Sequence, residues 1–375
     1  MASIVAATGL AGCRNDPTDP PGPGGDPVIA WQKADQRGGW NRPYADASIA
    51  VFTVLREPVA VALDAKTGAP RWEARLPVPG GALGGGIPPE GSATGVDDLI
   101  LVPAGDLFAL DRSTGQIRWT FTKADDFPGS GKVLVHGGRV FTVGRRLYAL
   151  DPSGGQPLWQ RDLGDRAANP IGAGDTLFVT SSDLVPGTNV LGNGHLHSLL
   201  AATGTELWRA ELAVPAPGRG GPFREPAVTD SLVLIATVDG RVVAFDRFTG
   251  AHRWTHSTGD ERDGGVAVLG NVAITTGPNG YVLALDRRSG ATVWSVPFFP
   301  QSGAVVNPVT VVESTAYVAQ FWVKAYAENG TVFWTHGGAD RGQPVYLTPP
   351  FVANGLVYIG GEKGLYALDP TKAKP

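Results

Sequence analysis

One pattern of apolar and polar positions recurs along almost the whole chain, and the stretch from Val242 to Trp254 contains all of its parts. Apolar and small residues alternate up to Asp246, which is typical of a half-buried strand. Asp246 can accept hydrogen bonds from backbone N–H groups two or three residues further on, and Gly250 supplies the positive φ of a tight turn. Trp254 falls on the returning strand as a large apolar anchor. Each copy therefore predicts a β-hairpin.

The copies follow one another at a nearly constant spacing. A Trp stands four residues after a Gly seven times, and successive copies of this Trp are 40 to 49 residues apart. These residues are Trp72, Trp119, Trp159, Trp208, Trp254, Trp294 and Trp334. A strand-rich repeat of about 40 residues is typical of a β-propeller, in which four-stranded blades surround a central channel.

The two ends of the chain supply an eighth unit. Leu365 to Asp369 restarts the pattern shortly before the C-terminus, and Trp31 stands alone near the N-terminus. We expect the N-terminal strand to complete the last blade, because such closure removes open sheet edges. The predicted fold is all-β: an eight-bladed β-propeller of four-stranded antiparallel blades over residues 28–370, followed by a C-terminal tail over residues 371–375.

The repeat resembles that of the pyrroloquinoline-quinone-like (PQQ-like) propeller family, in which an Ala-Leu-Asp-x-x-Thr-Gly-x-x-x-Trp pattern closes each blade. The resemblance covers about residues 28–370. The family includes quinoprotein alcohol dehydrogenases and the non-enzymatic lipoproteins of the BamB type, which belong to the outer-membrane β-barrel assembly machinery. The resemblance therefore implies the fold, whereas the function must be sought in other residues.

The N-terminal residues 1–13 are small and apolar and end in Leu-Ala-Gly-Cys, which resembles a bacterial lipobox. That resemblance implies that Cys13, the only Cys of the chain, carries a lipid anchor in a membrane; an incidental Cys in a leader is the alternative. Residues 14–27 are rich in Pro and Gly and predict a tether. Arg14 follows the Cys where the family's inner-membrane retention signal has Asp. We therefore expect an extracytoplasmic lipoprotein on the periplasmic face of the outer membrane.

Several kinds of chemistry are disfavoured. The net charge of −4 gives no support for nucleic-acid binding. Quinoprotein dehydrogenases would imply an adjacent Cys pair, a calcium site and a catalytic Asp, but one Cys cannot form the pair and no calcium loop of alternating Asp or Asn is present. We expect no bound PQQ, no metal, no catalytic residue and a monomeric chain.

Two histidines and two tryptophans are candidate site residues. His195 and His197 lie two apart on a predicted strand and share a face. Two imidazoles could begin a Zn²⁺ site, but the sequence offers no third ligand, so pocket or surface histidines are the favoured interpretation. Trp40 and Trp322 lie outside the repeat, and filling a gap between blades is favoured over lining a groove.

Two long insertions, Ser181–Gly194 and Pro215–Arg224, belong to neighbouring blades. Loops that join blades, and loops that join second to third strands, emerge on one face of a propeller, so we expect both insertions there. The candidate partner-binding residues near them are Arg219, Arg224, Glu225, Asp260, Arg262 and Asp263, and the candidate residues of the channel mouth are Asn169, Asn307 and Arg341. Loops that are simply polar and solvated are the alternative.

The sequence thus favours a non-enzymatic extracytoplasmic lipoprotein scaffold that binds a membrane-associated protein partner on one propeller face, in outer-membrane protein assembly. The alternative is a propeller that binds a small ligand, a quinone or a carbohydrate, in its channel, including as an oxidoreductase.

Overall fold

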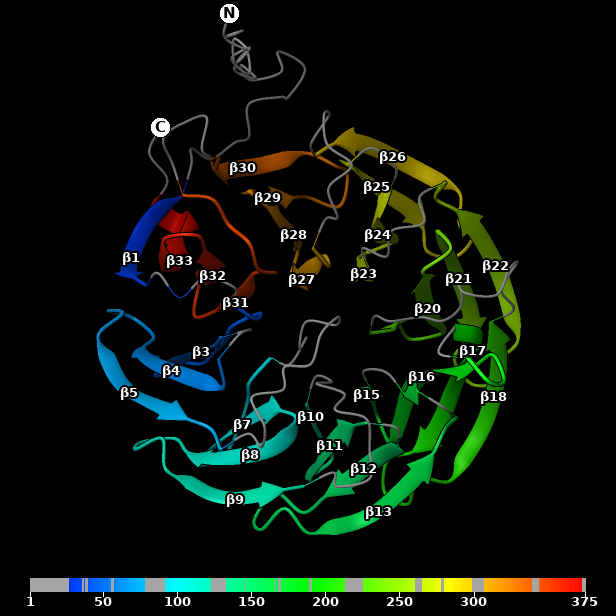
Figure 1. Cartoon of the computed structure of the whole chain (residues 1–375). Helices are drawn as coiled ribbons and strands as arrows, with labels where there is room; N and C mark the ends of the chain where they lie inside the picture. The colour runs from blue at the N-terminus through cyan, green and yellow to red at the C-terminus, as the bar shows by residue number, and fades with distance from the viewer. Residues whose placement is uncertain are drawn as a thin grey trace, which may run out of the picture.

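The computed structural model of the chain describes residues 27–35, 37, 40–54, 57–77, 92–122, 133–144, 146–164, 166–167, 170–188, 191–212, 225–259, 265–277, 280–298, 307–338 and 344–372. In these residues the elements are β-strands, apart from one 3₁₀ turn at Pro370–Lys372. None of the described segments forms a helix that is long and apolar enough to cross a membrane. The strands make eight antiparallel sheets arranged as a ring (Figure 1), so the predicted eight-bladed β-propeller is confirmed.

Each blade is a meander that runs from an innermost to an outermost strand. Blades one to four contain β2 (Tyr44–Ala45), β3 (Ile49–Thr53), β4 (Val59–Asp64), β5 (Pro70–Arg75); β6 (Thr94–Val96), β7 (Leu99–Ala104), β8 (Asp106–Asp111), β9 (Ile117–Phe121); β10 (Leu134–His136), β11 (Arg139–Val143), β12 (Arg146–Leu150), β13 (Pro157–Asp162); and β14 (Arg166–Ala167), β15 (Ile171–Ala173), β16 (Thr176–Leu184), β17 (Leu191–Leu200), β18 (Glu206–Leu212). In blade four, β14 and β15 both pair with β16, so two short strands share the innermost position.

Blades five to eight follow the same plan. They contain β19 (Ala227–Val228), β20 (Leu232–Thr237), β21 (Arg241–Asp246), β22 (His252–Ser257); β23 (Val266–Leu269), β24 (Val272–Gly277), β25 (Tyr281–Asp286), β26 (Thr292–Pro297); β27 (Thr310–Val312), β28 (Thr315–Gln320), β29 (Trp322–Tyr326), β30 (Val332–Gly337); and β31 (Phe351–Ala353), β32 (Leu356–Gly361), β33 (Gly364–Asp369), β1 (Val28–Ala34).

The eighth blade joins the two ends of the chain. Its strand order is β31, β32, β33 and then β1, and β1 runs antiparallel to β33 from Val28 opposite Asp369 to Ala34 opposite Gly364. Figure 1 shows this pair as the blue strand beside the red one. Closure of the ring by the N-terminal strand, as predicted, is therefore confirmed.

The inner strands are more deeply buried than the alternation in the sequence predicts. In β21 the four residues from Val242 to Phe245 are all buried, so the expectation of a half-buried strand is wrong. The reason is that each blade lies between two others and both faces of its middle strands meet apolar side chains. Only the outermost strands alternate between exposed and partly buried positions, as β5 does.

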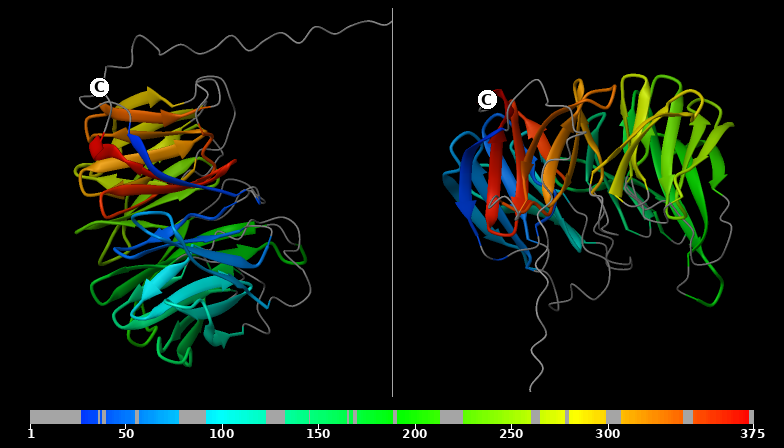
Figure 2. Two further views of the ribbon diagram at one scale, coloured as in Figure 1. Left: turned by 90° about the vertical axis from the view of Figure 1, so that its left-hand side faces the viewer. Right: turned by 90° about the horizontal axis from the view of Figure 1, so that it is seen from above.

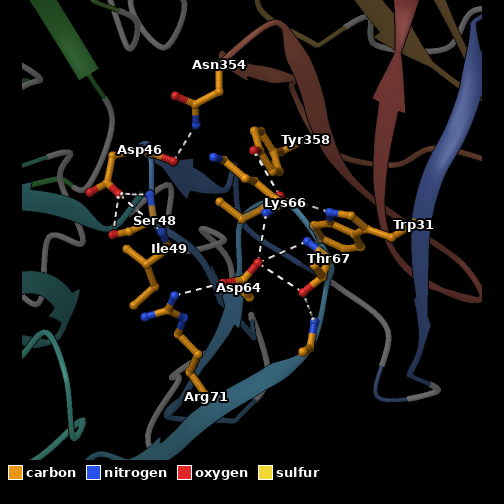
Figure 3. Close-up of polar contacts among 12 residues, drawn as sticks. Trp31, Asp46, Ser48, Ile49, Asp64, Lys66, Thr67, Arg71, Asn354 and Tyr358 are labelled. Atoms are coloured by element: carbon orange, nitrogen blue, oxygen red, sulfur yellow. Dashed lines mark hydrogen bonds and ion pairs between the residues drawn. The ribbon is translucent and has the colours of Figure 1, made fainter. Parts of the chain in front are cut away.

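The turn that ends the third strand forms as the sequence predicts. In blade five, Asp246 Oδ1 accepts hydrogen bonds from the backbone N–H groups of Phe248 at 3.0 Å and Thr249 at 2.9 Å. The Thr249 hydroxyl donates to the same oxygen at 2.9 Å, and Gly250 has φ of 71°. Figure 3 shows the equivalent turn of blade one, in which Asp64 accepts from the N–H of Lys66 and from both donors of Thr67.

The repeated Trp joins one blade to the next. Trp208 Nε1 in blade four donates to the Arg247 carbonyl in blade five at 3.1 Å, and its ring lies against Gly250 so closely that a Cβ there would be 2.6 Å from Cε3. Trp31 in blade eight makes the same contacts with blade one: its Nε1 donates to the Ala65 carbonyl at 2.9 Å (Figure 3), and its ring lies against Gly68. The Gly of the repeat is thus required for its φ and also for the space that the neighbouring indole occupies.

Every outermost strand of the described blades carries a β-bulge at the residue before its Trp. The ladder shifts register there in all eight sheets, for example at Arg253 between the partners of Ala244 and Phe245. A bulge on an edge strand disrupts its free ladder and opposes pairing with another chain. The bulges therefore protect the open edge that each blade has on the outside of the ring.

The two tryptophans outside the repeat lie in the framework. Trp40 is buried between blades eight and one, with its ring edge-on to Phe52 at 6.4 Å between centroids. It fills a gap between blades, as the favoured interpretation had it. Trp322 begins β29 and is partly buried.

Candidate functional site

The ring has two different ends. At one end, which we name the turn face, lie the Asp-x-x-Thr-Gly turns such as the one from Asp246 to Gly250, together with the first-to-second-strand turns. At the other end, the loop face, lie the connections between second and third strands and the ends of the outermost strands, from which the chain passes to the next blade. The tip of the β16–β17 hairpin therefore lies at the loop face, as do the described ends of β18 and β19 on either side of the second insertion.

Most sequence-predicted site residues lie outside the described part of the chain. These are Cys13, the partner-binding candidates Arg219, Arg224, Asp260, Arg262 and Asp263, and the channel-mouth candidates Asn169 and Arg341. Of the remaining two, Glu225 stands two residues before β19 and Asn307 three residues before β27, each leading into an innermost strand. The Asn307 amide donates to the Leu347 carbonyl of blade eight at 3.3 Å, so this side chain links two blades beside the ring axis.

Arg42 is a charged residue near the axis that the sequence analysis did not single out. It leads into β2, the innermost strand of blade one, and its guanidinium carbon lies 5.5 Å from the centroid of the Phe351 ring. Burial lowers the pKa of this guanidinium, and the negative charge of Glu225, which leads into the opposite blade, acts against that change. The positive charge of Arg42 therefore lies within electrostatic reach of Glu225.

The hairpin of β16 and β17 distinguishes blade four from the other blades. These strands have nine and ten residues, whereas β20 and β21 in blade five have six each. Ser181 pairs with His195 and Leu184 with Leu191, so most of the stretch expected to be an inserted loop is in fact strand. Figure 2 shows the green hairpin extending beyond its neighbours on the loop face.

A polar cluster lies at the base of this hairpin, on the face that meets blade three, with Ser181, His195 and His197 buried and their charged partners partly or largely exposed. In its first part, the Ser181 hydroxyl is 2.9 Å from His197 Nε2, and His197 Nδ1 is 2.8 Å from Glu206 Oε2. A neutral imidazole satisfies both contacts if Nδ1–H donates to the carboxylate and Nε2 accepts from the hydroxyl. His197 is 2% exposed, and burial lowers its pKa, whereas the hydrogen bond that the ring donates to Glu206 opposes that shift.

The second part of the cluster surrounds His195. Its Nε2 is 2.8 Å from Asp183 Oδ2, and the Arg209 guanidinium lies against the ring, with Nη2 3.1 Å from Nδ1 and from Nε2. The two imidazole centroids are 6.1 Å apart. The chain that leaves blade three at Gly164 covers the cluster, because a Cβ on this residue would lie 2.8 Å from Asp183 Oδ1.

The order Ser181, His197, Glu206 is that of a nucleophile, a base and an orienting acid, but the burial opposes catalysis. Ser181 is only 1% exposed, so a substrate carbonyl has no approach to its hydroxyl. The two histidines do share a face, as predicted, and each ring nitrogen has a protein partner. Within the described ranges, no group of three His, Cys, Asp or Glu side chains is arranged to hold a metal ion.

The sequence analysis found the two histidines and missed their partners. Ser181 and Asp183 on β16 are spaced by two, like the histidines, so strand periodicity places all four on one face. That signal was present, but the stretch had been interpreted as a loop. Glu206 and Arg209 lie on β18, beyond the turn at Gly204. They are three positions apart, and only the bulge before Trp208 brings both side chains to the same face of the strand.

An eight-bladed ring with this repeat, and with a Trp of each blade docked on the next, defines a propeller of the PQQ-like type. A profile described as "Outer membrane protein assembly factor BamB" matches the chain in three overlapping stretches, residues 103–254, 143–295 and 238–374. These stretches cover more than half of the sequence, and the chain belongs to this family.

Individual relatives are distant. Outer membrane protein assembly factor BamB of Burkholderia pseudomallei is 27% identical over 258 residues, which is 65% of this chain and 63% of that protein. The chain spans between half and two-thirds of the length of the first curated BamB relatives it matches.

Two solved structures show the same fold. The crystal structure of BamB from Moraxella catarrhalis has a TM-score of 0.59 at 21% identity, covering 88% of this chain and 96% of that one. Quinohemoprotein alcohol dehydrogenase from Pseudomonas putida has a TM-score of 0.64 at 14% identity, covering 92% of this chain and 75% of that one. At these identities, the likeness concerns the fold and leaves the activity open.

Proposed function

We propose that this protein is a non-enzymatic, lipid-anchored extracytoplasmic scaffold that binds a membrane-associated protein on its loop face, in outer-membrane protein assembly. Membership of the BamB family supports the process and the compartment. The long β16–β17 hairpin supports the choice of face, because it gives one blade a rigid projection that the repeat does not require.

The geometry of the closing strand agrees with such an anchor. β1 begins at Val28, opposite Asp369, and so enters the ring at the turn face. Residues 14–27 span at most about 50 Å when fully extended, at roughly 3.3–3.6 Å per residue. A lipid on Cys13 would therefore attach the ring from the end opposite the loop face, and the hairpin would remain free to meet a partner.

The experiment compares wild type with the double variant Arg219→Glu, Arg224→Glu in crosslinking capture from cells at matched expression. Arg can pair with carboxylates and stack on aromatic rings, so charge reversal in the β18–β19 connection should abolish capture of a membrane-associated partner while the melting temperature stays nearly unchanged. The matched control is Lys66→Glu with Arg288→Glu, two exposed residues of the turn face.

An identical set of captured proteins for wild type and the Arg219, Arg224 variant would remove this part of the loop face from the proposal. Loss of capture in the turn-face control as well would mean that charge in general, and not this surface, governs binding. A separate variant, Cys13→Ala, tests the anchor: it should release the protein from membranes into a soluble extracytoplasmic fraction.

A second candidate function, binding of a small ligand near the ring axis, rests on Arg42. Its guanidinium lies over Phe351, and its positive charge suits a ligand with an anionic group, which would compete with Glu225 for it. If a quinone were that ligand, adding PQQ with Ca²⁺ should raise the melting temperature of wild type and leave that of Arg42→Gln unchanged. We favour the scaffold, for which no cofactor is needed.

A further inference from the structure

The polar cluster of blade four joins the hairpin to the rest of the ring, and its hydrogen bonds depend on neutral imidazoles. The side chains of Ser181 and Asp183 come from β16, those of His195 and His197 from β17, and those of Glu206 and Arg209 from β18. The two imidazole rings thus link β16, β17 and β18 near the loop face. The tip of the hairpin, beyond Leu184, lies further out than this linkage.

A second proton on His195 would place a cation against a cation. Arg209 Nη2 lies 3.1 Å from both ring nitrogens and its Nε lies 3.3 Å from Nδ1. An imidazolium has no lone pair for these donors, and its charge repels the guanidinium at contact distance. Asp183, at 2.8 Å from Nε2, attracts the same charge, so protonation should keep the carboxylate contact and expel Arg209, which is exposed and free to move outward.

Protonation of His197 carries the cost of burying a charge. The ring is 2% exposed, and its Nε2 would change from an acceptor to a donor facing the Ser181 hydroxyl. Glu206 favours the imidazolium, whereas Arg209 and the neighbouring His195 oppose it, and the balance lowers the pKa of His197. The neutral form of His197 therefore fits the folded cluster best.

Among the described residues, the other charged side chains near the cluster hydrogen-bond elsewhere, including Glu211, which pairs with His195 across the ladder of β17 and β18. Glu211 on β18 accepts from Asn193 at 2.7 Å. On β13 of blade three, Arg161 donates to the Gly204 carbonyl at 2.6 Å, and Asp162 accepts from the Gly164 N–H at 3.1 Å. Within the part of the chain that the structure describes, we therefore expect the six side chains of the cluster to contribute most to the response to acid.

We propose that this cluster is a proton-sensitive latch, which holds the base of the β16–β17 hairpin at neutral pH and loosens it when His195 and His197 gain protons. The latch rests on the proposed function in one respect: if the hairpin carries the partner, acid should weaken capture. The loosening of the hairpin itself does not depend on any partner.

The test is amide hydrogen exchange of the intact protein at about pH 7.5 and about pH 5.5, corrected for intrinsic exchange rates, across the range in which His titrates. We expect protection of residues 176–200 to fall by about tenfold or more at the lower pH, with the β20–β21 hairpin of blade five unchanged. Equal protection of residues 176–200 at both values, or an equal loss in every blade, would overturn the latch.

Variants assign the effect to the cluster. His195→Gln cannot bring an imidazolium against Arg209, and it should therefore reduce the loss of hairpin protection at the lower pH. Arg209→Gln keeps both histidines and removes the opposing cation, so it should reduce the loss at low pH even if His195→Gln does not fold. His252→Gln, at an exposed histidine of β22, is the matched control and should behave as wild type.

Partner capture at the same two pH values separates the two proposals. If the hairpin loosens and capture is unchanged, the latch stands and the partner does not bind the hairpin. If capture falls while hairpin protection is constant, the latch is wrong and the proposed function is unaffected. If the hairpin loosens and capture falls in wild type, and the two changes are smaller in His195→Gln, both proposals are supported.

Discussion

The interface between blades eight and one and the interface between blades three and four share the same Trp–Gly contact but differ beyond it. Around Trp31 the first continues as an apolar core that includes Phe52 and Tyr358. The second begins with an apolar core around Phe141 and then changes, toward the loop face, into the polar cluster around His197. The Trp–Gly contact of the repeat thus determines how neighbouring blades pack. The interface of blades three and four differs from this plan where polar side chains replace apolar ones, and this is the specialised part of the ring.

The largest expected effect breaks the first of these interfaces. Deletion of residues 28–33 leaves β33 as an unpaired edge and removes Trp31, whose loss alone should lower the free energy of unfolding by about 3–5 kcal/mol. Urea unfolding followed by tryptophan fluorescence measures the change. Phe248→Ala, at a side chain 70% exposed, is the control without effect. An unchanged midpoint and solubility after the deletion would show that the ring does not need this strand.

A smaller effect isolates the contact that both interfaces share. Gly250 and Gly355 have φ of 71° and 73°, but only at Gly250 would a Cβ meet an indole ring, whereas nothing lies within 4 Å of one at Gly355. Substitution of Gly355 by Ala should cost about 1–2 kcal/mol through the backbone alone. Gly250→Ala should cost about 1–3 kcal/mol more through overpacking against Trp208. Equal losses of unfolding free energy for the two variants would mean that the Trp208 ring moves aside without a cost.

The pH dependence of stability sharpens the difference between the interfaces. The pKa of His197 is lower in the folded chain than in the unfolded one, so below about pH 6.5 the unfolded chain binds more protons. The free energy of unfolding should therefore fall as the pH decreases from 6.5 to the folded pKa, and then level off. In His197→Gln this slope should be smaller, while His252→Gln retains it. A slope that is the same in both variants would assign the acid sensitivity to other groups.

The smallest effect concerns the bulge position before the Trp. Arg253 there forms an exposed ion pair with Asp246 at 2.6 Å, whereas blade four has the exposed Leu207 at the same position. Because exposed pairs contribute about 0–1 kcal/mol, Arg253→Leu should shift the unfolding free energy by no more than about 0.5 kcal/mol. A loss of unfolding free energy several times larger would mean that the ion pair stabilises the conformation of the turn.

Much of the fold followed from the sequence because the repeat carries its own signals. Asp246 and Gly250 act within one turn, and local hydrogen bonds fix their conformation. The unpaired Trp31 predicted the closure of the ring, since one blade lacked its tryptophan. The docking of each Trp on the next Gly was not predicted, because a contact between residues about 40 positions apart leaves no mark in either local pattern.

The site was less predictable than the fold. The sequence predicts that Ser181 and Asp183 lie in an inserted loop. Extra residues between two strands can form a loop or can lengthen both strands, and in blade four they lengthen both strands. Arg42 contacts Phe351 because blades one and eight pack together, and the spacing of residues in the sequence does not indicate this contact. The predicted binding residues Arg219 and Arg224 belong to a blade-joining connection outside the described ranges, and their role stays a prediction.

The closing strand also determines how the ring would bear a pulling force. If the chain is held by a lipid at Cys13 and by a partner at the loop face, tension enters at Val28 and runs along β1. Since β1 lies alongside β33, that load acts in shear and is shared by the paired residues from Val28 to Ala34, instead of opening them one at a time from an end. The pair of β1 and β33 is held by hydrogen bonds and packing with no connecting loop, and the anchor would load this pair in shear, the direction in which paired strands resist force best.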